Sequence, residues 1–249
     1  MHQITHVPVA MPGLSVARTR GNELYVGVKD TFMLSRIEEG ASRFWTHGRE
    51  WSAERGSMVV HQPGDVHRDL ARSGVVTYQI IRLAPALVEG VPQDVRVPPL
   101  LLDGDPRGLA MHRLHEAVAA NANRFALECA VAEAVDGMTA SDARFPETGP
   151  VRRALALIRE RLDETITLEE LARHARLDKF HLCRAFRAQV GMPPHAYQVQ
   201  LRVMRAKELL AGGVKAKDIA ARVGFYDQAQ LTRHFRKIVG TTPARFARG

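Results

Sequence analysis

Residues 178–194 read DKFHLCRAFRAQVGMPP, and residues 227–243 read DQAQLTRHFRKIVGTTP. The second stretch repeats the first at an offset of 49 residues. The shared residues are Asp178 and Asp227, Leu182 and Leu231, Arg184 and Arg233, Phe186 and Phe235, Arg187 and Arg236, Val190 and Val239, Gly191 and Gly240, and Pro194 and Pro243. Chance does not produce such a run, so the C-terminal part uses one structural unit twice.

Each copy is predicted to be a helix with signals at both ends. Its first residue is an aspartate, which is a good N-cap, and Gln230 stands where it can reach back in a capping box. A leucine and a phenylalanine four residues apart form one apolar stripe that must face a core. The glycine suits a left-handed C-cap, and the following proline prevents continuation. The opposite face, which carries the arginines, is left for solvent or a ligand.

A shorter helix is expected before each copy, at residues 168–174 and 216–222. The sequence Thr167-Leu-Glu-Glu170 is a capping box that opens the first of these helices. Residues 194–210 read as one long helix between the two units, with Tyr197, Leu201, Met204 and Leu209 on its apolar side. A short helix, a turn and a second helix with an arginine-bearing face indicate a helix-turn-helix.

These motifs resemble the DNA-binding domain of the AraC/XylS family of bacterial transcription regulators. The resemblance covers about 100 residues and includes Val223-Gly224-Phe225 and Thr242-Pro243 besides the repeat. It implies two helix-turn-helix units in successive major grooves of double-stranded DNA. The family's base-contacting positions fall on Phe180, Cys183 and Arg184 in the first copy, and on Ala229, Gln230 and Arg233 in the second. Lys179, Arg187, Arg236 and Lys237 are predicted to contact phosphates, although a solvated role is the alternative.

Charge separates the chain into two halves. The 249 residues contain 35 Lys and Arg against 27 Asp and Glu, a net charge of +8. Residues 1–148 hold 15 against 18, a net of −3, whereas residues 149–249 hold 20 against 9, a net of +11. Such asymmetry points to a polyanionic partner for the C-terminal half, with a solvated basic surface that improves solubility as the alternative.

Composition excludes several classes of protein. The hydrophobic content of 45% is too high for a disordered polyelectrolyte, and 19 Gly and 13 Pro are too few for collagen. No apolar run approaches the ~20 residues of a membrane span, and the first residues lack a secretory pattern. The cysteines, Cys129 and Cys183, are isolated from each other. We therefore expect a cytoplasmic protein without disulfides or membrane contact.

The first 100 residues favour an antiparallel barrel or sandwich, because short β-rich runs alternate with Gly, Pro and Asp turns. Gln62-Pro-Gly-Asp-Val-His67 is similar to the second motif of cupins, and Phe44-Trp-Thr-His47 stands in the place of the first. The resemblance implies an effector pocket for an unknown small molecule. Its candidate residues are His47, Glu50, His67, Trp45, Trp51 and Tyr78, although the aromatic ones are equally plausible as core.

Two alternatives involve the same residues. His47, Glu50 and His67 are the candidate ligands of a catalytic metal, which would make the protein a cupin-type metal-dependent enzyme with an accessory DNA-binding domain. The usual His-x-His pair reads Thr46-His47-Gly48, so we expect no metal, no cofactor and no enzymatic activity. A constitutive DNA binder with a vestigial barrel is the third hypothesis. Sugars, aromatic acids, fatty acids and metals are all compatible with the pocket residues.

The sequence therefore predicts an α+β multidomain protein with four segments. Residues 1–104 form the cupin-like effector-binding β domain, residues 105–140 a helical pair for dimerisation, residues 141–150 a linker, and residues 151–249 the all-α double helix-turn-helix domain. The helical pair begins at the Asp105-Pro106 cap. The predicted function is a one-component, effector-responsive transcription regulator. Its predicted partners are double-stranded DNA, a small-molecule effector, a second copy and RNA polymerase.

Overall fold

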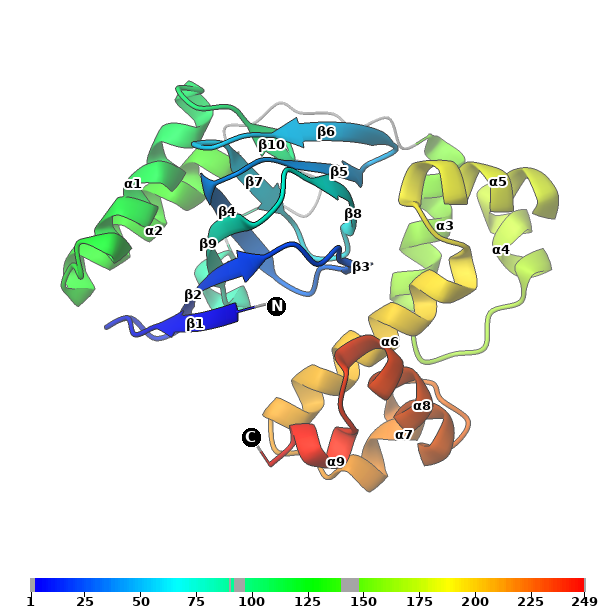
Figure 1. Ribbon diagram of the computed structural model, residues 1–249. Helices are drawn as coiled ribbons and strands as arrows, with labels where there is room; N and C mark the ends of the chain where they lie inside the picture. Colours follow the sequence, from blue (N-terminus) through cyan, green and yellow to red (C-terminus); the bar gives the residue numbers. More distant parts are fainter. Residues whose placement is uncertain (1–2, 90, 92–96, 140–147, 249) are drawn as a thin grey trace. The chain divides into compact units, whose positions relative to one another are not determined.

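The computed structural model describes residues 3–89, 91, 97–139 and 148–248. The chain divides into two compact units, Met1–Phe145 and Pro146–Gly249. The predicted order of an antiparallel β domain followed by a helical domain is confirmed (Figure 1). No helix in the described ranges has the length and apolarity needed to cross a membrane.

The first unit is built on two sheets in which all paired strands are antiparallel. The six-stranded sheet has the order β1 (Gln3–Val7), β2 (Leu14–Gly21), β9 (Val76–Leu83), β4 (Phe32–Glu39), β7 (Met58–His61) and β10 (Leu100–Leu101). The four-stranded sheet has the order β3 (Val26–Val28), β8 (Val66–Arg72), β5 (Ser42–Thr46) and β6 (Arg49–Ala53).

Strand β4 shows why the six-stranded sheet is apolar on both faces. Side chains alternate along a strand, so Leu34 and Ile37 belong to different clusters. Leu34 packs with residues of the helices α1 (Leu109–Ala119) and α2 (Arg124–Thr139). Ile37 joins Phe44 of β5 and Ala53 of β6 in a core between the two sheets. The helices thus cover one face of the large sheet, and the small sheet covers the other (Figure 1).

The entrance to the helical pair differs in detail from the prediction. Asp105 accepts a hydrogen bond from the backbone N of Arg107, but it caps the short 3-10 helix η2 (Pro106–Gly108) rather than α1. A second 3-10 turn, η1 (Pro85–Leu87), follows β9. The predicted linker at residues 141–147 lies outside the described residues. Gly149 and Pro150 are a correction to that linker, because they form the first turn of α3 (Gly149–Glu160), where proline is tolerated.

The second unit is helical throughout its described residues. The first half contains α3, α4 (Leu168–Ala175) and α5 (Lys179–Val190), and the long helix α6 (Pro194–Ala211) follows. The second half contains η3 (Ala216–Asp218), α7 (Ile219–Arg222), α8 (Gln228–Val239) and α9 (Pro243–Phe246).

The buried face of α6 corrects the predicted apolar side. Tyr197 is fully buried as expected, but the remaining buried stripe includes Val199, Val203, Ala206 and Leu210. These residues recur at spacings of four and three, which keeps them on one side of a helix with 3.6 residues per turn. The predicted Leu201, Met204 and Leu209 are half-buried beside that stripe.

Candidate nucleic-acid interface and effector pocket

Helix α5 is fixed at both ends and on one face by the residues that the repeat singles out. The Asp178 carboxylate accepts hydrogen bonds from the backbone N of Phe180 and of His181, both at 3.0 Å. Gly191 ends the helix in the left-handed region at φ 91°. Leu182 and Phe186 are fully buried. This anchoring directs the other face of α5 outward.

The outward face of α5 carries most of the predicted DNA-contacting residues of the first copy. Phe180 is 72% exposed, which is unusual for a large apolar side chain. Arg184 and Arg187 are exposed, whereas Cys183 is half-buried. The Lys179 ammonium lies 3.0 Å from a carboxylate oxygen of Glu169 on α4. Four of the five residues are therefore accessible, and one of them already has an acidic partner.

Helix α8 repeats this arrangement with one difference in its cap. Asp227 accepts a hydrogen bond from the backbone N of Gln230 at 2.6 Å. The Gln230 side chain reaches back, as the capping box predicts, but its Oε1 accepts from the backbone N of Tyr226 at 2.9 Å. Gln230 is half-buried, and its amide NH₂ group takes no part in this cap.

The remaining predicted contacts of the second copy are Ala229, Arg233, Arg236 and Lys237, and all four are exposed. Leu231 and Phe235 are fully buried on the opposite face of α8. The two copies therefore use the same inward pair and the same outward arginines. Tyr226, directly before the cap, is 94% exposed and was not singled out by sequence analysis.

Arg202 of α6 connects the two helix-turn-helix halves. Its guanidinium donates to the backbone O of Leu162 at 2.7 Å and of Glu164 at 2.6 Å in the first half. It also donates to the backbone O of Gly224 in the second half at 2.6 Å. A Cβ at Gly224 would lie 2.5 Å from the backbone O of Asp163, and its φ is +81°. The halves thus meet at a contact that requires glycine.

A groove of about 760 Å³ lies between the two halves of this unit. Cys183 of α5 and Gln230 of α8 both line it, and Arg202 contributes to the same wall. The groove is therefore continuous with residues of both candidate recognition helices. It is a concave surface between two exposed arginine-bearing faces.

The β domain contains a separate pocket of about 280 Å³ between its two sheets. Its apolar wall includes Leu24, Tyr25, Met33, Phe44, Val59, Tyr78 and Ile80, and its polar wall includes Thr19, Glu23, Lys29, Ser35, Ser42, His61, His67, Asp69 and Arg72. The volume is just below the usual range for small-molecule sites, about 300–1,000 Å³. The pocket therefore suits a small metabolite.

His67 and Tyr78 are the predicted pocket residues that the structure places in this wall. His67 Nε2 lies 2.8 Å from the Asp69 carboxylate, and its ring stacks on Phe44 with centroids 4.9 Å apart. Tyr78 lies under the guanidinium carbon of Arg72, 5.4 Å from the ring centroid. Both predicted side chains therefore belong to a network of charged and aromatic groups.

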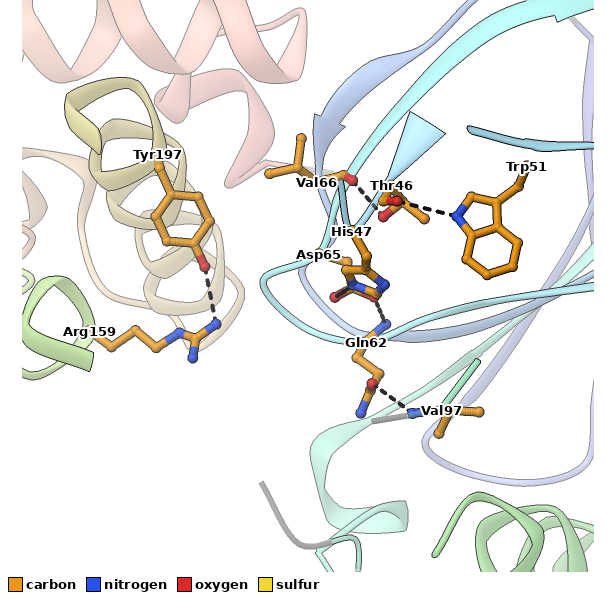
Figure 2. Close-up of polar contacts among 9 residues, drawn as sticks. All are labelled: Thr46, His47, Trp51, Gln62, Asp65, Val66, Val97, Arg159 and Tyr197. Atoms are coloured by element: carbon orange, nitrogen blue, oxygen red, sulfur yellow. Dashed lines mark hydrogen bonds and ion pairs between the residues drawn. The ribbon is translucent and has the colours of Figure 1, made fainter. Parts of the chain in front are cut away.

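The other predicted pocket residues do not line this pocket. His47 occupies the tight turn after β5 with φ 50°, and its Nε2 lies 2.7 Å from the Asp65 carboxylate (Figure 2). Glu50 is exposed, 4.0 Å from Arg43. Trp51 donates its indole N–H to the backbone O of Thr46 (Figure 2).

Trp45 is also outside this pocket, because side chains alternate along a strand. Phe44 lines the pocket, so its neighbour Trp45 points to the other face of β5. There the ring of Trp45 lies beneath the guanidinium of Arg68, 5.4 Å from its carbon. The cupin-type metal set does not gather either. No group of three or more His, Cys, Asp or Glu side chains among the described residues is arranged to hold a metal ion.

Sequence analysis missed the charged part of the pocket, which comprises Lys29, Asp69 and Arg72. The Arg72 guanidinium lies 2.8 Å from the Asp69 carboxylate and also donates to the backbone O of Gly21. One signal could have found Asp69, because it stands two residues after His67 on the same strand and so shares its face. Lys29 lies just beyond β3, where no periodic pattern applies.

Burial changes the protonation behaviour of this network. Burial would raise the pKa of Asp69, but hydrogen bonds from His67, from the backbone N of Tyr25 and from Arg72 lower it to about 2. Burial lowers the pKa of His67 below its ordinary value and that of His61 well below it. At neutral pH the pocket therefore holds an ionised Asp69 and two neutral histidines.

Two capped helices with outward arginines, and a β domain with its own charged pocket, define a DNA-binding protein with a separate ligand-binding domain. Residues 171–249 match the family model of a helix-turn-helix domain, and residues 16–135 match that of the AraC-like ligand binding domain. The chain belongs to the AraC family of DNA-binding transcription regulators and carries that family's effector-binding domain.

Individual relatives agree with this assignment. The transcriptional regulator YbfI of Bacillus subtilis is 25% identical over 217 residues, which is 81% of this chain and 79% of YbfI. The transcriptional activator AarP of Providencia stuartii is 31% identical over 97 residues, 39% of this chain and 72% of AarP. The match to the structure of ToxT from Vibrio cholerae covers 96% of this chain and 98% of the ToxT chain, with a TM-score of 0.54 and 11% identity. The likeness to ToxT concerns the fold.

Proposed function

We propose that this regulator places α5 and α8 in successive major grooves on one face of the DNA. The observation that carries the proposal is the duplicated outer face, on which Arg184 and Arg233 occupy the same position of two equivalent helices. An exposed arginine in the major groove can bind guanine through two hydrogen bonds. The contacts of Arg202 with both halves fix the spacing at which the two helices act.

The remaining predicted DNA contacts have different roles in this proposal. Phe180 and Ala229 offer only apolar surface, which suits a thymine methyl group. Cys183 is a neutral contact, and Gln230 donates from its amide NH₂ group, which takes no part in the cap. The phosphate contacts are Lys179, Arg187, Arg236 and Lys237.

The effector is proposed to act by differential binding. A ligand in the pocket of the β domain binds one arrangement of the two units more tightly than the other. This difference in binding free energy shifts the population toward that arrangement and so changes the affinity for DNA. The protein is proposed to be a regulator without enzymatic activity. In support, His47, Glu50 and His67 have separate partners in Asp65, Arg43 and Asp69.

We also propose that the protein is a cytoplasmic homodimer that pairs through residues 105–140 and contacts RNA polymerase. Supporting the pairing, Phe125 at the start of α2 is 74% exposed and Leu109 at the start of α1 is 46% exposed. Light scattering should give twice the mass of the chain for the wild type. A monomeric mass at the concentrations that bind DNA would overturn this part of the proposal.

A gel-shift titration tests the central proposal. The purified protein is incubated with DNA from upstream of its own and neighbouring genes, and with shuffled DNA of the same composition. We expect a preferred fragment that remains bound at about 150 mM salt while the shuffled DNA dissociates, because base contacts add to the salt-sensitive phosphate term. Equal affinity for both DNAs at every salt concentration would reduce the protein to a nonspecific DNA binder.

A further inference from the structure

The wall of the β-domain pocket includes a lysine, Lys29, with which no carboxylate of the described residues pairs directly. Lys29 is half-buried as a residue, but its ammonium group is enclosed by the protein. The group lies 4.0 Å from the centroid of the Tyr25 ring. Among the described residues, no carboxylate oxygen lies within 4.0 Å of it, and Asp69, Asp30 and Asp65 act on it only from farther away. Burying an ammonium group without a directly paired carboxylate costs desolvation free energy, which an anionic ligand would offset.

The other charges inside the pocket are already compensated. The Asp69 carboxylate accepts from His67 at 2.8 Å and from Arg72 at 2.8 Å, so it forms one closed network with Arg72. His61 and His67 are neutral at pH 7, because burial lowers the pKa of each. Glu23, the remaining charged residue of the wall, is exposed to solvent. Lys29 is therefore a cation of this wall that forms no direct ion pair with a carboxylate of the described residues.

The remaining wall indicates the body of the ligand. Tyr25 and Phe44 both approach the His67 ring, with centroids 6.2 Å and 4.9 Å from it. The side chains of Met33, Val59 and Ile80 add aliphatic surface to the same cavity. On this apolar surface most hydroxyl groups of a sugar would lack hydrogen-bond partners, whereas an apolar or aromatic body fits it.

We propose that the effector of this protein is a small carboxylic acid with an apolar or aromatic body, bound with its carboxylate on the Lys29 ammonium. This inference rests on the proposed effector-responsive function and names the chemical class of its ligand. The carboxylate completes an ion pair in an enclosed site, where a charge-assisted hydrogen bond is stronger than at the surface. Neutral sugars and bare metal ions are excluded from the role.

Protonation of Lys29 gives the proposal a second signature. Burial lowers the pKa of the free ammonium to about 8, and nearby Asp69, Arg82, Asp30 and Asp65 modify that effect. The acid binds the charged form of Lys29. Raising the pH through 8 therefore removes the charge and weakens binding, by about tenfold between pH 7 and pH 9.

The test uses the full-length protein and a panel of benzoate, phenylacetate, hexanoate and octanoate, each paired with its neutral amide. Thermal shift identifies binders, and calorimetry measures their affinity for the wild type, Lys29→Gln, Lys29→Arg and the exposed control Lys217→Gln. At least one acid should raise Tm with increasing concentration while its amide does not. Lys29→Gln should lower affinity at least about tenfold, and Lys217→Gln should leave it unchanged. Lys29→Arg should retain binding and lose the dependence on pH between 7 and 9, because arginine stays protonated.

The outcomes separate this inference from the proposed function. It is overturned if no acid of the panel binds, if the amides bind as well as the acids, or if Lys29→Gln keeps wild-type affinity. Gel shifts with and without the ligand are recorded in parallel. If specific DNA binding responded only to a neutral metabolite, the carboxylic-acid class of the ligand would be wrong and the proposed regulatory function would stand. Acid binding at Lys29 that never changes DNA affinity would confirm the ligand class and contradict the effector mechanism.

Discussion

The outward arginines of the proposed recognition helices occupy two kinds of position. Arg184 and Arg233 stand two residues beyond a buried leucine, in the outward row of each helix, whereas Arg187 follows the buried phenylalanine near the helix end. A base contact distinguishes sequences, while a phosphate contact is the same for every sequence. We therefore expect alanine substitutions at these two kinds of position to impair DNA binding in different ways.

Arg184→Ala and Arg233→Ala should each relax specificity at one base position, at a cost of about 1–3 kcal/mol on the preferred base. Arg187→Ala should weaken all sites to a similar degree. Binding to a library of single-base variants of the preferred fragment measures both effects. The exposed Arg205→Ala on α6 serves as the control for loss of a positive charge. Uniform loss from all three recognition-helix variants would contradict this division.

The pocket illustrates how a single residue decides whether a sequence-based assignment succeeds. Phe44 and Trp45 are adjacent aromatics on β5, and both are buried. Choosing the inward one requires the register of the strand, which a cupin-like motif alone does not provide. Lys29 could not be predicted from the sequence, because its proposed role depends on distances in three dimensions, which place no carboxylate of the described residues in direct contact with it.

At the scale of elements, the helices were predictable and the strands were only partly so. Caps, the Leu/Phe stripes and the terminal glycines are local signals, and they placed α4, α5 and α8 within one or two residues. The β domain depends on pairings between distant strands, such as β2 with β9 and β5 with β8. Local sequence indicates that strands exist there, but it does not show which face of each one meets the pocket.

In the proposed binding mode, α6 sets the spacing between α5 and α8, and its contacts predict the effect of loosening it. Arg202→Met keeps much of the apolar stem but removes three hydrogen bonds to carbonyls of the two halves. Hydrogen bonds from a charged donor contribute roughly 1.5–3 kcal/mol each, although losses within one network are not additive. We expect a destabilisation of about 2 kcal/mol or more, measured by urea denaturation.

The same variant should reduce affinity for the complete binding site more than for either half of it, because only the complete site requires fixed spacing between α5 and α8. Anisotropy titrations on full and half sites measure this difference. Arg205→Ala, on the same helix but paired with Glu208 at its surface, is the control. An equal loss on full and half sites would assign Arg202 to folding alone.

At the scale of the whole molecule, the net charge of +8 divides into −3 for residues 1–148 and +11 for residues 149–249. The acidic half therefore contributes no general attraction to DNA, and the basic half supplies the electrostatic part of the affinity. This division keeps nonspecific binding within the domain that reads the sequence. It also means that ligand binding and DNA binding should respond differently to salt.

The logarithm of DNA affinity should fall linearly with the logarithm of salt concentration. Four cationic side chains assigned to phosphates give a slope of about −3.6 per protomer, and about −2.7 if Lys179 stays paired with Glu169. Arg187→Ala should make the slope shallower by about 0.9. Arg124→Ala, an exposed arginine of α2 in the acidic half, should leave it unchanged. Anisotropy titrations across a series of salt concentrations provide the slopes. If Arg124→Ala changed the slope as much as Arg187→Ala, the acidic half would also contact the DNA backbone, and the assignment of the two halves to separate tasks would be wrong.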